Sequence, residues 1–259
     1  MKILFEDYKG NLDRFIDAYR MILLESINYS ISNELVDDIL KNINKKCFSY
    51  STKELQQFIS NIKDISLTIL VTTSKTVKSD LSNFKIQINN DKISVIKSEL
   101  QQHYAIIEDT SDSHKFLFIN DNITDLDILK QTLRHELTHL LEVNESSKKW
   151  YDLLPQNPKQ IEHTNIYQML SLLGLKLNMN YAQFYYLMSA KEFEAYCTCV
   201  EDNKDKINKN NVNNFLNFIF TDEFESLSSS LKLCYIFLFL NLTLDKDTKE
   251  RLQYLRQHL

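Results

Sequence analysis

The chain reads Leu-Arg-His-Glu-Leu-Thr-His-Leu at residues 133–140, and this stretch decides how the rest of the sequence is interpreted. Residues four apart lie on one face of an α-helix, so His135 and His139 can direct two imidazoles at one metal ion. Glu136 follows the first histidine and lies beside the pair. The stretch therefore predicts a metal-binding helix with a carboxylate next to the metal.

The residues before this stretch predict how the helix begins. Thr124 is a typical N-cap residue, and Asp127, three residues further on, is an acidic partner of the kind found in a capping box. Residues 115–120 form a short apolar run, which predicts a strand leading into the helix. Leucines recur at helical spacing and predict a long helix buried along one face. They are Leu126, Leu129, Leu133, Leu137, Leu140 and Leu141.

Composition limits the classes of function. The net charge is -5 and there is no long block of Lys or Arg, which argues against a nucleic-acid partner. Glu6 and Asp7 come too early for the apolar core of a signal peptide, so we expect a cytoplasmic protein. The longest apolar run, residues 233–240, is shorter than the roughly 20 residues of a membrane span, and it predicts a buried helix instead.

The four cysteines show no C-x-x-C spacing, which fits a reducing compartment better than a disulfide framework. Cys47, Cys197, Cys199 and Cys234 are therefore predicted to be small core residues.

Two kinds of pattern precede the metal-binding stretch. Helical spacing of apolar residues and a capping box at Ser51 and Glu54 predict an N-terminal helical region, residues 1–64. The chain has only 2 Gly and 2 Pro, which also favours helices. From residue 65, β-branched and alternating runs predict a small sheet. Its strands are expected at residues 67–73, 84–88, 93–96 and 104–107, with a turn at residues 89–91.

Downstream, a helix is expected at residues 166–177, and another begins at Ser189. His163 lies between the metal-binding stretch and these helices, where it is either a surface residue or a ligand or proton donor. The tyrosines Tyr181, Tyr185 and Tyr186 form an aromatic cluster, for which core packing is the first interpretation and substrate contact the second.

Hydrolytic zinc sites have three protein ligands and one open position, so two histidines need a third donor. Glu192 and Glu194 are two residues apart, about 200° around a helix, so only one of them can face the metal. Glu192 lies beside the apolar positions Tyr196 and Val200, whereas Glu194 is followed by polar residues in its own direction. Glu192 is therefore the predicted ligand, although it could also cap the helix by bonding to the Ser189 backbone.

With these residues named, the chain resembles the gluzincins, and more closely the small bacterial and phage metallopeptidases with an H-E-x-x-H helix and a later E-x-E-A helix. The resemblance covers residues 115–200. It implies that His135, His139 and Glu192 bind Zn²⁺, that Glu136 is the general base, and that a phage association is possible. In this family an edge strand runs beside the cleft and can pair with an extended substrate. Many members have Asp or Asn where this chain has Tyr196, so the residue that would orient a ligand histidine is not supplied.

The last part of the chain has no recognisable chemistry. Residues 202–211 are rich in Lys, Asn and Asp and predict a linker. Helices are expected at residues 215–220, 224–240 and 245–259. The predicted organisation is thus an N-terminal helical region at 1–64, a zincin-like domain at 65–203 and a helical cap at 204–259. The predicted fold class is α+β, with a small, mostly antiparallel sheet packed on the metal-binding helix.

The function expected from this sequence is zinc-dependent hydrolysis of a peptide or protein substrate, with no nucleic acid and no membrane span. Glu136 would carry the proton transfers, and Tyr196 or His163 would stabilise the oxyanion. The alternative is a binding or structural protein, such as a virion or toxin-associated component, that keeps a zincin fold without turnover. An intact Glu136 favours the enzyme, because a structural zinc needs no base beside its ligands.

Overall fold

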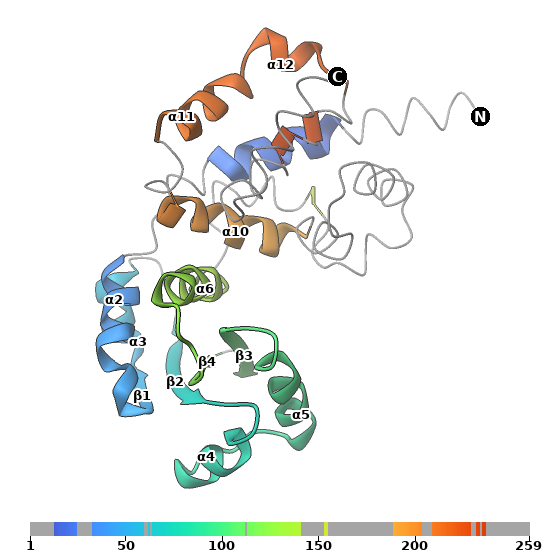
Figure 1. Cartoon of the computed structure of the whole chain (residues 1–259). Coiled ribbons are helices and arrows are strands. Elements are labelled where there is room, and N and C mark those ends of the chain that lie inside the picture. The colour runs from blue at the N-terminus through green and yellow to red at the C-terminus, as the bar shows by residue number, and fades with distance from the viewer. Residues whose placement is uncertain are drawn as a thin grey trace, which may run out of the picture. The chain divides into compact units, whose positions relative to one another are not determined.

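The computed structural model describes residues 13–24, 33–59, 62, 64–111, 113–140, 153–154, 189–203, 209–228, 232–233 and 235–236 (Figure 1). Contacts divide the chain into two units. One is Ser30–Glu142, and the other combines Met1–Tyr29 with Val143–Leu259. The domain boundaries expected at residues 64 and 203 remain predictions.

The unit Ser30–Glu142 has an α+β fold built on a mixed four-stranded sheet with the strand order β1-β2-β4-β3. The strands are β1 (Cys47–Tyr50), β2 (Ser66–Thr72), β3 (Ala105–Ser111) and β4 (His114–Asn120). β2 and β4 are parallel, whereas the β1–β2 and β3–β4 pairs are antiparallel. The strands expected at 67–73, 104–107 and 115–120 are confirmed. β1 lies in the region predicted to be helical, so that prediction was incomplete.

One face of the sheet packs against three helices: α2 (Asn33–Asn42), α3 (Thr52–Phe58) and α6 (Leu126–Thr138). Apolar side chains fill the core between them because alternate residues of a strand point to the same face, as Leu67, Ile69 and Val71 of β2 do. The helix expected at Ser51 is confirmed as α3, with a complete capping box between Ser51 and Glu54. The hydrogen bonds from Ser51 keep the pKa of the Glu54 carboxyl below its usual value.

The other face of the sheet carries α4 (Val77–Asn83) and α5 (Asn90–Glu99). Strands were expected at residues 84–88 and 93–96, and both predictions were wrong. The expected turn at 89–91 is instead the start of α5, where the Asn89 side chain accepts a hydrogen bond from the Asp91 N–H. Ile93, Ile96 and Leu100 pack into the same core at spacings of three and four residues, which is the helical pattern and not strand alternation.

Helix α6 begins one residue later than expected. Its N-cap is Asp125, not Thr124, and the Asp125 side chain accepts hydrogen bonds from the N–H groups of Asp127 and Ile128. Leu126 is 62 % exposed and does not belong to the buried face, because the first turn of the helix projects beyond the sheet's core. Leu129, Leu133, Leu137 and Leu140 are buried as predicted, and Leu141 lies outside the described residues.

In the other unit, the described elements are a helix at residues 13–24, α10 (Ala190–Asn203), α11 (Lys209–Phe218) and α12 (Asp222–Ser226). The helix expected from Ser189 is confirmed as α10. The expected linker at 202–211 is too long, since α10 and α11 extend into it at both ends. The continuous helix expected at 224–240 is interrupted after Ser226, and residues 166–177 and 245–259 lie outside the described part.

The helix at residues 13–24 is fixed to α10 and α12 by buried side chains. The rings of Tyr19 and Phe193 lie 4.7 Å apart. Arg20 is largely buried and donates a hydrogen bond to the Glu225 carboxylate, which also accepts one from Lys232. The Lys232 and Arg20 cations hold the pKa of Glu225 below its usual value. The guanidinium also lies over the rings of Phe220 (4.8 Å) and Phe224 (5.3 Å), so the cluster is built around one carboxylate and two aromatic rings.

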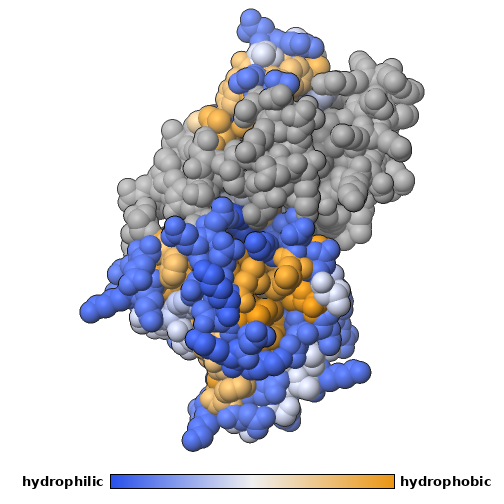
Figure 2. All heavy atoms as spheres, turned by 60° about the vertical axis from the view of Figure 1, so that its left-hand side comes forward, coloured by the Kyte–Doolittle hydropathy of each residue, from blue (hydrophilic) through white to orange (hydrophobic). Residues whose placement is uncertain are grey.

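Some large apolar side chains remain exposed at the surface. Figure 2 shows an apolar area surrounded by hydrophilic residues on the face in view. Within the described part of Ser30–Glu142, the large apolar side chains that are exposed are Phe84, Val95, Leu126 and Ile128. Among the described helices, none is long and apolar enough to cross a membrane.

Candidate metal centre

The two histidines of the central stretch project from the end of α6. The centroids of the His135 and His139 rings are 5.0 Å apart and their planes are nearly perpendicular, at 86°. His139 is the C-cap residue of α6 and keeps helical dihedral angles (φ -68°, ψ -12°), so the four-residue spacing still places both rings on one face. The motif was expected inside a long helix, and the structure places it in the last turn of a 13-residue helix.

The opposite face of α6 fixes the histidines in space. Leu133 and Leu137 are completely buried in the core beneath the sheet. Arg134 is 2 % exposed, and its guanidinium donates a hydrogen bond to the Asn33 side chain at the start of α2. A helix held by a packed core and a buried polar contact has little freedom to rotate, so the half-buried His135 and His139 leave it in fixed directions from the same face.

Glu136 turns toward the sheet. Its Oε2 atom accepts a hydrogen bond of 2.8 Å from the main-chain N–H of Ile107 in β3. Helix α6 packs against this strand, and the Ile107 side chain lies partly buried against the same core as the α6 leucines. The carboxylate predicted to act as a base is therefore held by the backbone of a strand. No sequence pattern indicates this contact, because its donor is a main-chain group.

The register explains why Ile107 can donate to a helix. The Asn120 N–H bonds to the Tyr104 carbonyl, so in this antiparallel pair Ile106 and Glu108 bond to β4 while Ile107 and Asp109 point their main-chain groups away. β3 is an edge strand, and some main-chain groups on its outward side make hydrogen bonds to side chains. The Glu136 carboxylate accepts a hydrogen bond from the Ile107 N–H, and the Lys92 ammonium donates one to the Asp109 carbonyl.

The third predicted ligand lies in the first turn of α10. Glu192 is half-buried and precedes Phe193, which is completely buried. Tyr196 is one helical turn beyond Glu192 and is also half-buried, so the two side chains share one face of α10. Glu194 lies on another side, close enough to Cys197 for its charge to act on the thiol.

The cysteines of α10 are core residues, as predicted. Cys197 and Cys199 are buried, Cys47 is half-buried, and these three cysteines form no disulfide bond. Burial raises the pKa of the Cys197 thiol well above its ordinary value, and the nearby Glu194 charge adds to this effect. Cys234 is outside the described residues.

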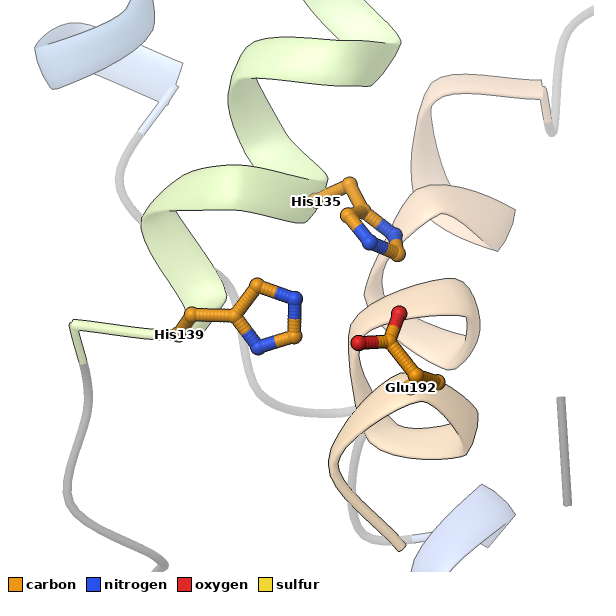
Figure 3. Close-up of side chains that lie close together, drawn as sticks. All are labelled: His135, His139 and Glu192. Carbon is orange, nitrogen blue, oxygen red and sulfur yellow. The ribbon is translucent and has the colours of Figure 1, made fainter. Parts of the chain in front are cut away.

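Figure 3 shows the His135, His139 and Glu192 side chains. Each has one potential ligand atom within 4.8 Å of the others, and they form one group that could hold a metal ion. Glu194, although it lies on the same helix as Glu192, is not a member of this group. Two nitrogens and one oxygen are donors that suit several divalent metals.

The remaining candidates cannot be placed. His163 and the cluster of Tyr181, Tyr185 and Tyr186 lie outside the described residues, so their predicted roles stay predictions. Comparisons with protein-family models, curated proteins and solved structures find no match for this chain.

Proposed function

We propose that the protein is a zinc-dependent metallopeptidase of gluzincin type with a zincin-like fold. The observation that carries this proposal is the group of His135, His139 and Glu192 with Glu136 in sequence beside the first ligand. A metal held only for stability needs no carboxylate next to its ligands, whereas a hydrolytic metal site needs a base at that position.

The donor set fits zinc. Two imidazole nitrogens and one carboxylate oxygen are the three protein ligands of a hydrolytic zinc site, which keeps its fourth position for water. Ligand atoms bound tetrahedrally at about 2.1 Å lie about 3.4 Å from one another. The candidate ligand atoms are within 4.8 Å of each other, so rotations of the three side chains would bring them to binding distance.

The reaction follows from the chemistry of these groups. Bound zinc would polarise the scissile carbonyl and lower the pKa of a water molecule in its open position. Glu136 would accept a proton from this water as its oxygen forms a bond to the carbonyl carbon. Glu136 would then pass the proton to the amide nitrogen as the C–N bond breaks. One carboxylate thus performs both proton transfers and ends in its starting state.

Tyr196 is the candidate for stabilising the oxyanion among the described residues. It shares the face of α10 that carries Glu192, and its phenol O–H is a hydrogen-bond donor. The substrate class we propose is a peptide or protein, bound in extended form beside the edge strand β3.

The test is a metal analysis of purified protein together with cleavage of a mixed peptide library. We expect about one zinc per chain, hydrolysis that stops with a chelator, and recovery when zinc is added back. Activity should also fall in acid, where protons compete with zinc for the imidazoles. Protein that contains zinc but cleaves no peptide would favour a binding or structural role. Hydrolysis that a chelator leaves unchanged would contradict the proposal.

A further inference from the structure

The Glu136 carboxylate has two oxygens, and one of them accepts a hydrogen bond from the backbone of β3. Its Oε2 accepts the Ile107 N–H at 2.8 Å. A base that takes a proton from water needs one oxygen directed at that water, and this task falls to Oε1. The hydrogen bond to Oε2 therefore determines where Oε1 points.

A main-chain donor is well suited to this task. A glutamate side chain has three rotatable bonds, so on a helix surface it samples several rotamers. The Ile107 N–H does not move independently, because the neighbouring residues Ile106 and Glu108 pair with Phe118 and Phe116 of β4. Hydrogen bonds to a charged acceptor are also about twice as strong as neutral ones.

We propose that the main-chain N–H of Ile107 positions Glu136 for proton transfer, so that β3 is part of the catalytic arrangement through its backbone. This inference rests on the proposed peptidase function. Ile107 is a positioning residue, and the identity of its side chain is secondary. The Ile107 N–H is then not a substrate-binding group, and an extended substrate beside β3 has to use other main-chain groups of the strand.

Proline tests the role of this single N–H. Ile107→Pro removes the donor but no bond of the β3–β4 ladder, because the Ile107 N–H points away from β4. We expect kcat to fall about a hundredfold, as for other small displacements of a catalytic group. KM and zinc content should stay at the wild-type values. Ile107→Val keeps the N–H and should behave as wild type. Glu108→Pro removes a ladder bond and should destabilise the fold.

Amide hydrogen exchange of the metal-free protein tests the contact without any activity. The Ile107 N–H lies on an outer edge, so its protection should depend on Glu136. In Glu136→Ala its exchange should accelerate by at least about tenfold, while exchange at Glu108, which faces β4, should not change. This readout also decides the matter if Ile107→Pro fails to fold.

The outcomes are distinct. Wild-type kcat in Ile107→Pro, or unchanged exchange at Ile107 in Glu136→Ala, would overturn the inference while leaving the peptidase proposal intact. Loss of zinc or a raised KM in Ile107→Pro would also overturn it, since a positioning role affects the chemical step alone. A wild-type protein that hydrolyses no peptide but protects the Ile107 N–H would show that the proposed function fails, and the catalytic role of Ile107 with it.

Discussion

The two faces of α6 carry different kinds of residue. One face buries Leu129, Leu133 and Leu137 in the core of the sheet, where each side chain is at most 1 % exposed. The other face carries His135 and His139, which are half-buried and whose rings lie 5.0 Å apart. The leucines contribute stability by leaving water, whereas the histidines contribute nitrogen atoms at a fixed place.

From this difference we expect that stability and the proposed chemistry can be separated on one helix. Core leucines can be tested by unfolding the metal-free protein, and site residues can be tested by metal binding and hydrolysis. If a site substitution unfolds the metal-free protein, or a core substitution changes zinc binding without changing stability, the division between the faces is wrong.

The largest effect is expected from removing a ligand on the site face. His139→Ala should weaken zinc binding by more than about a hundredfold, the upper range for losing an outer partner of a ligand. The free energy of unfolding of the metal-free protein should change by less than about 0.5 kcal/mol, because the side chain is not in the core. Competition with a chelating dye measures the first quantity and urea denaturation the second. A large loss of stability without metal would contradict the division.

The next effect extends the comparison to α10. Glu192→Ala should weaken zinc binding by about a hundredfold or more, whereas Glu194→Ala, two residues away, should bind zinc nearly as wild type. The two variants remove the same group from opposite sides of one helix, so they control for each other. If the Glu194 variant loses the metal and the Glu192 variant keeps it, the predicted third ligand is wrong.

The core face supplies the third test. Leu133→Ala removes a completely buried side chain and should lower the free energy of unfolding by about 3 kcal/mol. Leu126→Ala, on the same helix but 62 % exposed, should cost less than about 0.5 kcal/mol. Urea denaturation of both variants gives the two values. Equal losses would mean that the first turn of α6 is buried after all.

The smallest effect concerns the Arg20 and Glu225 cluster. Glu225→Gln should destabilise the protein by no more than about 1 kcal/mol at neutral pH, since the Glu225 side chain is 49 % exposed to water. The folded pKa of Glu225 is lowered, so its contribution is present above the unfolded pKa of about 4.3 and is lost as pH falls through the folded value. Unfolding curves of the two proteins should therefore converge in acid. A difference that does not shrink at all as the pH falls below about 4.3 would assign the effect to packing.

Sequence patterns predicted those helices and strands whose signals lie within a short stretch of the chain. The capping box at Ser51, the leucine spacing of α6 and the apolar run of β4 each lie within a few residues. β1 was missed because four residues are too few to show alternation. The run at 93–96 was assigned to a strand because β-branched residues are common to both structures, and only packing against α4 and the sheet reveals the helix.

The same distinction holds at the site. The spacing of His135, Glu136 and His139 is visible in the sequence, because a helix determines which residues share a face. Glu192 could be chosen over Glu194 by the apolar side of its own helix. The Ile107 contact could not be predicted, since it joins residues 29 positions apart through a backbone N–H that any residue but proline provides.

We propose that Glu136 is the base beside a metal that other residues bind. A comparison of wild type and Glu136→Gln in metal content and peptide hydrolysis tests this role. We predict about one zinc per chain in both proteins, and hydrolysis in wild type that is lost in the variant, because the amide keeps the shape but cannot accept the proton. Equal hydrolysis in both proteins, or no bound metal in wild type, would contradict the account.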